Sequence, residues 1–236
     1  MAKYDINLDS LDDAIKDIKE GKLVILLDNP SREGEGDFVG PAALMTPDQL
    51  NTVMTYARGA FIAILMPEDC ADRFGLPPQL DPSRNFESRK TNFRVSCDTR
   101  YGRSGCSAAE RAQTANILGG RFNPYASSTF AYTSENDLAG VVRQSQFDDL
   151  VRPGHVIPIV ANTQGLYARQ GHTEGSVELM KLAGIDPPVS IDMEILNPNG
   201  EMAKSTYIRA LADREGIKVV SIGQICDYLG IREKTN

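Results

Sequence analysis

The chain contains no tryptophan, only two histidines and only four cysteines among its 236 residues. The cysteines show neither a C-x-x-C pair nor another metal-ligand spacing, which favours reduced, mostly buried thiols of a cytosolic protein over a disulfide scaffold. No apolar run approaches the length of a membrane span, and residues 1–20 lack the apolar segment and cleavage site of a signal peptide. We therefore expect a cytoplasmic protein without a membrane partner.

Basic charge is also scarce. The chain has 25 Lys and Arg residues against 32 Asp and Glu residues, a net charge of −7. Proteins that bind nucleic acid generally carry a basic face, so we expect no nucleic-acid partner. A local basic pocket for a small anion is still compatible with this composition.

Helical and strand patterns alternate along the whole chain, with no linker and no internal repeat. This pattern predicts a single α/β (α+β) domain over residues 1–236, in which helices cover a mixed β-sheet. Residues 75–92 and 122–150 are expected to be irregular. The expected helices cover residues 11–20, 47–58, 67–74, 104–118, 174–183, 203–215 and 222–229. The expected strands cover residues 23–27, 61–66, 93–98, 156–161, 189–196 and 217–220.

A charged loop follows the first expected strand, with the sequence Arg32-Glu33-Gly34-Glu35-Gly36-Asp37. Ligands of open α/β sheets bind beyond the carboxyl ends of strands. The carboxylates of this loop are suited to a hard divalent ion such as Mg²⁺ or Mn²⁺. A solvated turn of alternating charge explains the loop alone equally well.

Both histidines lie in similar short contexts, Arg152-Pro153-Gly154-His155 and Arg169-Gln170-Gly171-His172-Thr173. His172 directly precedes an expected helix start, where backbone N–H groups attract anions, so this segment predicts a phosphate site beside a metal-ligating histidine. The alternative is an ordinary helix cap. His155 precedes an expected strand and can be a structural hydrogen-bonding residue. Glu194 ends another strand, where a carboxylate can act as a general base or simply face solvent.

A further expected helix start lies at Ser104-Gly105-Cys106-Ser107. This segment can supply hydroxyl and N–H groups to a ligand, or it can be only a helix cap. Cys106 could also be a nucleophile, but the sequence has no histidine near it that could activate the thiol.

Taken together, these motifs resemble the 3,4-dihydroxy-2-butanone 4-phosphate synthase family of riboflavin biosynthesis. R-E-G-E-G-D is similar to the family's R-E-N-E-G-D signature, and S-A-A-E-R to its S-A-x-D-R segment. R-P-G-H, R-x-G-H-T-E, V-E-L-x-x-L-A-G and a strand ending in glutamate follow in the family's order. The likeness extends from about Leu23 to Tyr228.

The resemblance implies that D-ribulose 5-phosphate is converted to 3,4-dihydroxy-2-butanone 4-phosphate and formate, with Mg²⁺ (or Mn²⁺), by a homodimer whose active sites lie near the subunit interface. Some relatives carry a cyclohydrolase domain after this one, and from the length of 236 residues we expect no such second enzyme here. The implied metal ligands are Glu33 and His172. The implied catalytic residues are His155, Glu194 and Asp37. The implied substrate-binding residues are Arg32, Glu33, Asp37, Arg169, Gln170, Gly171, His172 and Thr173.

The chain departs from the family pattern in several places. The usual acidic run before R-E reads Asp28-Asn29-Pro30-Ser31, and Thr91-Asn92 replaces a G-T pair. Arg103 and Cys106 stand in a segment that usually reads T-T-G-[IV]-S, and residues 123–150 are longer than the family equivalent. These departures leave two alternatives open: a paralogue acting on another phosphorylated sugar, and a catalytically silent anion-binding relative.

Overall fold

The computed structural model describes residues 4–59, 61–121 and 149–232. Its helices are α1 (Leu11–Lys19), α2 (Pro47–Ala57), α3 (Glu68–Arg73), α4 (Ala108–Leu118), α6 (His172–Leu182), α7 (Ser205–Glu215) and α8 (Ile222–Tyr228). Its strands are β1 (Val24–Leu27), β2 (Gly36–Pro41), β3 (Ile62–Met66), β4 (Asn92–Phe93), β5 (Cys97–Thr99), β6 (Leu150–Val160), β7 (Ser190–Glu194) and β8 (Lys218–Ser221).

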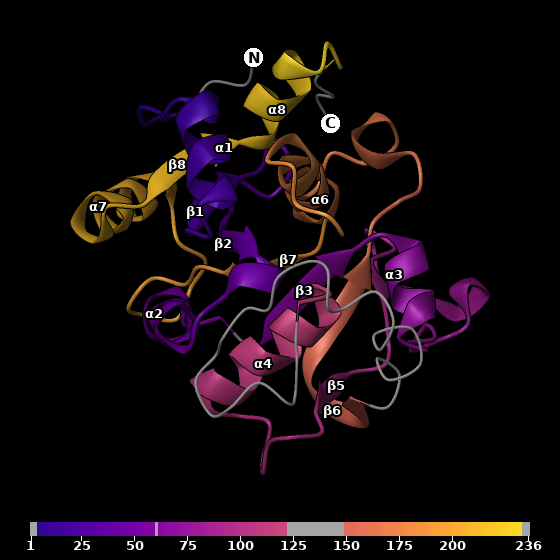
Figure 1. The fold of residues 1–236 in the computed structure, drawn as a ribbon. Helices are drawn as coiled ribbons and strands as arrows, with labels where there is room; N and C mark the ends of the chain where they lie inside the picture. The colour runs from indigo at the N-terminus through magenta and orange to yellow at the C-terminus, as the bar shows by residue number, and fades with distance from the viewer. Residues whose placement is uncertain (1–3, 60, 122–148, 233–236) are drawn as a thin grey trace.

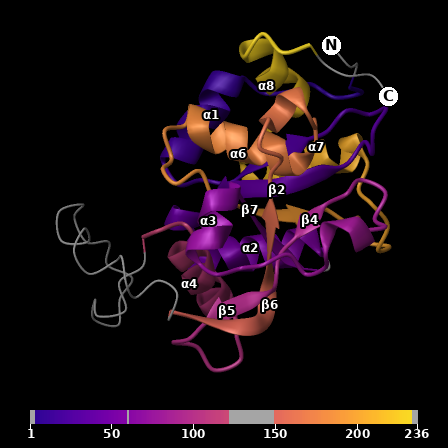
Figure 2. The same cartoon turned by 90° about the vertical axis from the view of Figure 1, so that its right-hand side faces the viewer.

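The strands form one eight-stranded mixed sheet in the order β4-β6-β3-β7-β2-β1-β8, with β5 also paired to β6 (Figures 1 and 2). The pairs β1–β8 and β3–β6 are parallel, whereas β2 is antiparallel to both of its neighbours. In both views β5 and the adjoining part of β6 lie at the end of the molecule opposite α1 and α8. The predicted α/β class, a mixed sheet covered by helices, is confirmed.

Strand β1 shows why the sheet carries helices on both faces. Its four residues are all buried, because alternate side chains point to opposite faces of a strand and each face has its own core. Val24 and Leu26 pack into the cluster formed with α1, α6 and α8. Ile25 and Leu27 pack into the cluster formed with α2, α4 and α7. No helix within the described ranges is long and apolar enough to cross a membrane.

Helix α6 is central to the first of these cores. Leu179, Met180 and Ala183 at its carboxyl end are buried against α1 and α8. A Cβ added to Gly175 would meet Ile222 Cγ1 at 2.9 Å, so a glycine here lets α6 lie close to the start of α8. The first turn of α6 is therefore fixed relative to the sheet by packing further along the helix.

Strand β2 is absent from the sequence-based expectation, which assigned its first residues to the charged loop. The glycines at its start and middle break the apolar pattern, but the packing requires them: a Cβ on Gly36 would meet Leu27 Cδ2 at 2.6 Å, and one on Gly40 would meet Leu23 Cδ2 at 2.9 Å. Asp37 is thus a strand residue, opposite Glu194 of β7.

Several predicted boundaries also differ. Strand β6 begins at Leu150 rather than at residue 156, so His155 lies inside the strand. Helix α4 begins at Ala108 rather than at residue 104, because Ser107 and Glu110 form a capping box there. Helix α6 begins at His172 with Gly171 as its N-cap. The strand expected over residues 93–98 is divided between β4 and β5, and the expectation for residues 122–148 lies outside the described residues.

Candidate active site

A cavity of about 280 Å³ lies on the face of the sheet that carries the first turn of α6. Alternate residues of neighbouring strands face it, since alternate side chains of a strand share one side. The register places Asp37 of β2 opposite Glu194 of β7, and Ala63 of β3 opposite Asp192. The cavity is lined by Arg32, Glu33, Asp37, Phe61, Ala63, Leu65, Glu87, Arg89, Thr91, Phe93, Ile159, Arg169, His172, Thr173, Asp192, Met193 and Glu194.

Beside this cavity, Asp28, Glu33 and His172 form a cluster in which one ligand atom of each residue lies within 4.8 Å of the others. Asp28 follows β1 and is fully buried. Its Oδ1 accepts a hydrogen bond from Glu35 N at 3.0 Å, and its Oδ2 accepts one from Arg32 Nη1 at 2.7 Å. These contacts tie the loop that carries Glu33 to the end of β1. Two carboxylates and one imidazole suit a hard divalent ion.

His172 is held in the form that a metal ligand requires. Burial lowers the pKa of its imidazole, so the ring is neutral near neutral pH. Its Nδ1 lies 3.3 Å from Asp37 Oδ2, and a proton on Nδ1 leaves the lone pair of Nε2 available. Among the residues that the structure describes, buried Nε2 has no hydrogen-bond partner. The residues present therefore fit a divalent ion at this cluster.

Three carboxyl groups line the same cavity next to His172. Burial raises the pKa of Asp37 well above its usual range, and nearby Asp192 and Glu194 raise it further. Burial and the neighbouring Glu194 raise the pKa of Asp192 to about 7. Burial and the neighbouring Glu33 also raise the pKa of Glu194. Carboxyl groups whose pKa is raised are suited to both donating and accepting protons.

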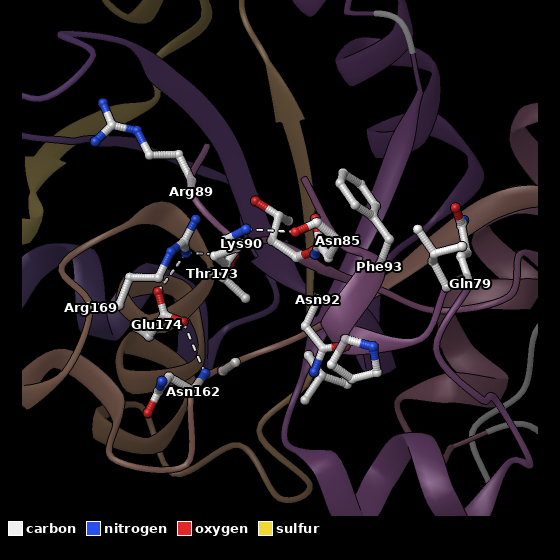
Figure 3. A pocket seen from close by; sticks show the side chains of 15 residues that line it. Gln79, Asn85, Arg89, Lys90, Asn92, Phe93, Asn162, Arg169, Thr173 and Glu174 are labelled. Carbon is white, nitrogen blue, oxygen red and sulfur yellow. Dashed lines mark hydrogen bonds and ion pairs between the residues drawn. The ribbon is translucent and has the colours of Figure 1, made fainter. Parts of the chain in front are cut away.

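Arg169 and Thr173 also line the cavity, just before and within the first turn of α6. Arg169 Nη1 lies 2.7 Å from Glu174 Oε2 and donates to Thr173 Oγ1 at 3.4 Å (Figure 3). Glu174 Oε1 in turn accepts from Asn162 N at 2.9 Å, which fixes the carboxylate that orients the arginine. A second cavity of about 510 Å³ shares Arg169 and Thr173 with the first (Figure 3).

Gly171 lies between two guanidinium groups. A Cβ added there would meet Arg169 Nη1 at 2.7 Å and Arg32 Nη2 at 3.1 Å. Gly171 is also the N-cap of α6. Because glycine has no side chain that could accept from the first backbone N–H groups of the helix, these donors can bind a ligand instead. Two arginines that converge on a helix start form a site for a phosphate group.

Sequence reasoning missed three residues of this site. Asp28 was noted only as part of an altered acidic run, yet it is the buried member of the metal-type cluster. Arg89 Nε lies 3.2 Å from Glu33 Oε1, a contact between distant segments that no local pattern indicates. Asp192 did leave a signal, because it is a charged residue in the middle of an otherwise apolar strand.

Two predicted site residues lie elsewhere among the described residues. His155 is absent from the cavity lining; its side chain is 53% exposed, and its Nδ1 lies 2.7 Å from Asp98 Oδ2. Gln170 is also absent from the lining, and its Nε2 donates to Arg232 O at 2.9 Å. Cys106 is exposed on the loop before α4 and is likewise no part of the cavity.

A mixed sheet whose cavity combines a cluster of metal-ligand type with a helix start flanked by two arginines defines a class of protein suited to chemistry on phosphorylated substrates. The particular family follows from comparison with known proteins. The family model of 3,4-dihydroxy-2-butanone 4-phosphate synthase matches residues 12–228. The chain belongs to this family, and the resemblance noted in its sequence is confirmed.

Individual relatives agree with this assignment. The 3,4-dihydroxy-2-butanone 4-phosphate synthase of Agrobacterium fabrum is 37% identical over 220 residues, which cover 93% of this chain and 91% of the relative. A probable bifunctional riboflavin biosynthesis protein of rice, Oryza sativa subsp. japonica, described as chloroplastic, is 36% identical over 226 residues, or 95% of this chain. The match spans only 36% of that rice protein.

Solved structures share the fold. A 3,4-dihydroxy-2-butanone 4-phosphate synthase in complex with two magnesium ions has a TM-score of 0.78 and 29% identity, with coverage of 94% of this chain and 97% of that one. A two-domain synthase from A. baumannii also has a TM-score of 0.78, at 28% identity, with coverage of 96% of this chain and 59% of the other.

Proposed function

We propose that the chain is a divalent-metal-dependent carbon–carbon lyase that converts D-ribulose 5-phosphate into 3,4-dihydroxy-2-butanone 4-phosphate and formate in riboflavin biosynthesis. The observation that carries this proposal is the set of side chains that line one cavity, in a chain that belongs to this family. A cluster of metal-ligand type, acids with raised pKa values and a phosphate-type site at the start of α6 all border the same space of about 280 Å³.

Glu33 and His172, joined by Asp28, would hold the ion. Mg²⁺ is the first choice, because carboxylate oxygens suit it and a related synthase is described in complex with two magnesium ions. Mn²⁺ suits the same ligands. When bound, such an ion supplies Lewis-acid stabilisation of negative charge on neighbouring substrate oxygens.

Arg169 and Thr173 hold the phosphate of the substrate at the start of α6, with Arg32 on the other side of Gly171. A phosphate bound away from the reacting carbons supplies orientation and binding energy without taking part in bond breaking. Glu174 keeps the Arg169 guanidinium in place through its ion pair at 2.7 Å. The assignment of Gln170 to the substrate remains a prediction.

Asp37 and Glu194 carry the proton transfers. They lie opposite each other on β2 and β7, so a substrate between the phosphate site and the metal-type cluster meets both. The raised pKa of Asp37 favours its protonated form as an acid, while the exposed Glu194 can accept a proton at the cavity. The enediol formation and water loss implied for this family need one group of each kind.

His155 acts in the site of a second copy of the chain. The parallel register of β3 and β6 begins at the pair Ile62 and Val156, directly after His155. Because alternate residues of a strand share a face, His155 points to the same side of β6 as Ile159, which lines the cavity. His155 is nonetheless exposed, and Asp98 holds its imidazole in one orientation. An oriented, exposed histidine on this face fits a homodimer in which the partner's His155 completes the cavity.

Formate release from D-ribulose 5-phosphate by the purified chain tests the proposal. We expect stoichiometric formate that requires Mg²⁺, disappears on chelation and returns when Mg²⁺ is added back. Glu194→Gln should lower turnover by at least about 100-fold, the usual contribution of an acid–base group. Glu201→Gln, a change of an exposed acid after the same strand, is the matched control and should leave turnover intact. Absence of formate from the folded wild-type protein would overturn the proposal.

A further inference from the structure

Arg89 links two segments that border the cavity. Its Nε lies 3.2 Å from Glu33 Oε1, and its Nη2 donates to Arg32 O at 3.3 Å, so its side chain reaches the charged loop. Arg89 also lines both the cavity of about 280 Å³ and the cavity of about 510 Å³, as do Arg169 and Thr173 (Figure 3 shows the larger one). One guanidinium group thus borders both the metal-type cluster and the phosphate-type site.

Arginine side chains engage both carboxylate oxygens of Glu33. Arg32 Nη1 pairs with Oε2, and Arg89 Nε faces Oε1. A divalent ion that takes Glu33 as a ligand competes with these guanidinium groups for the carboxylate and is repelled by their charge. We therefore expect one of the two arginines to leave Glu33 when the ion binds.

Arg89 is the arginine that can leave more easily. Arg32 Nη1 also lies 2.7 Å from Oδ2 of the fully buried Asp28, and the Arg32 side chain is 10% exposed. The Arg89 side chain is 38% exposed, and within the described residues Glu33 is the one carboxylate that its guanidinium pairs with. Because a partly exposed ion pair contributes little free energy, Arg89 can exchange this partner at little cost.

The backbone that carries Arg89 is held in place, so the exchange needs only a turn of the side chain. Glu87 Oε1 accepts from Arg89 N and Glu87 Oε2 accepts from Thr91 N, both at 2.7 Å. Asn85 Nδ2 donates to Thr91 O at 3.0 Å. An exposed side chain on such an anchored segment changes rotamer readily, without movement of the segment itself.

A phosphate group is the anion to which Arg89 can turn. Arg169, which shares both cavities with Arg89, is already paired with Glu174 at 2.7 Å. Its positive charge is thus largely balanced before any ligand binds. A phosphate at Arg169 and Thr173 carries up to two negative charges, and an arginine released from its own carboxylate is suited to pair with it.

We propose that Arg89 couples the two ligands of the cavity: it pairs with Glu33 in the empty site and with the phosphate group in the occupied site. The inference rests on the proposed function for the divalent ion and the phosphate, and it adds the residue through which each promotes the binding of the other. Because such coupling is reciprocal, phosphate raises the affinity for the ion by the same factor as the ion raises the affinity for phosphate.

Calorimetric titration with Mg²⁺, with and without saturating inorganic phosphate, tests this coupling without turnover. With free Mg²⁺ corrected for its association with phosphate, phosphate should raise the Mg²⁺ affinity of wild type about fivefold, the upper range for a partly exposed ion pair. Without phosphate, Arg89→Gln should bind Mg²⁺ about fivefold more tightly than wild type does, because the competitor for Glu33 is gone. Phosphate should then change the Mg²⁺ affinity of this variant much less.

Arg84→Gln is the matched control. Arg84 is an exposed arginine that precedes Arg89 in the same segment and lines neither cavity. This variant should keep the wild-type affinity for Mg²⁺ and the wild-type effect of phosphate. Arg89→Lys retains the positive charge and should remain closer to wild type than Arg89→Gln does.

The inference is wrong if Arg89→Gln binds Mg²⁺ no more tightly than wild type, or if phosphate strengthens Mg²⁺ binding equally in both proteins. It is also wrong if folded wild-type protein binds no divalent ion. Wild-type protein that shows the coupling but releases no formate from D-ribulose 5-phosphate would refute the proposed function and leave the role of Arg89 standing. Formate release combined with an unchanged Mg²⁺ affinity of Arg89→Gln would do the reverse.

Discussion

The two histidine segments of this chain have nearly the same local sequence and opposite surroundings. In Arg169-Gln170-Gly171-His172 the histidine opens a helix, is 8% exposed and faces Asp28 and Glu33. In Arg152-Pro153-Gly154-His155 the histidine lies within strand β6 but outside the cavity lining, and it is exposed, with its Nδ1 2.7 Å from Asp98 Oδ2. A short motif therefore states what a histidine can do, while its position in the fold decides what it does.

The sharpest test of this difference is removal of each imidazole. His172→Ala should abolish Mg²⁺-dependent formate release and weaken Mg²⁺ binding by at least about 100-fold, since even residues that only support a ligand contribute 10–100-fold. His155→Ala should also lower formate release but should bind Mg²⁺ as wild type does. Calorimetric Mg²⁺ titration of both variants separates the two roles. Equal loss of Mg²⁺ affinity in both would contradict the comparison.

Mixed dimers test whether the two histidines of one site come from different subunits. His155→Ala and His172→Ala subunits, each nearly inactive alone, are unfolded, mixed in equal amounts and refolded together. Half of the dimers should be hybrids, and each hybrid holds one intact site, so roughly a quarter of wild-type turnover should return. Refolded mixtures that stay inactive, although native mass spectrometry shows hybrids, would place His155 in its own subunit's site or outside catalysis.

The acids around His172 should make the free energy of unfolding depend on pH, an effect that we do not expect from the His155 segment. The folded-state pKa of Asp192, about 7, lies above its ordinary value of 3.8. The folded protein therefore binds more protons than the unfolded chain between these pH values, and its free energy of unfolding decreases as pH rises through them, by up to about 4 kcal/mol.

Urea unfolding from pH 5 to pH 8 in the presence of a chelator measures this effect. Asp192→Asn should show a flatter pH dependence than wild type. Ser190→Ala should retain the wild-type slope. A slope that persists unchanged in Asp192→Asn would assign it to other groups.

The glycines before the two histidines, Gly154 and Gly171, should differ in what a substitution by alanine disturbs. A Cβ on Gly154 would lie 2.2 Å from the carbonyl carbon of Cys97, a backbone atom that cannot move aside. A Cβ on Gly171 would meet the ends of two arginine side chains. Gly154→Ala should therefore lower the free energy of unfolding by about 1–3 kcal/mol, as overpacking does, whereas Gly171→Ala should lower it less and mainly weaken phosphate binding.

Thermal unfolding and titration with inorganic phosphate measure the two effects. The pattern is refuted if Gly171→Ala proves to be the less stable of the two variants.

The sequence predicted those parts of the fold in which local pattern and tertiary structure agree. Helix α2 has both its capping threonine and Pro47 in the sequence, and it begins where they indicate. Strand β2 was missed because its glycines are required by side chains from another strand. Leu27 and Leu23 of the neighbouring segment leave no room for a Cβ at Gly36 and Gly40, and no pattern in the sequence of β2 itself shows this. The sequence placed the charged loop and His172 at one site, and the structure brings Glu33 and His172 together there. Only the folded chain shows that Asp28 lies with them and that His155 is absent from the lining of this cavity.

Asp28 has one more consequence. Its carboxylate accepts from Glu35 N and Arg32, and its own N–H donates to Glu35 O at 3.2 Å, so the loop between β1 and β2 is tied to itself at both ends. The loop that presents Glu33 has then lost its conformational entropy during folding rather than during ligand binding. Binding at this end of the cavity should accordingly resemble a rigid-body event, with a small heat-capacity change and little rearrangement of the backbone.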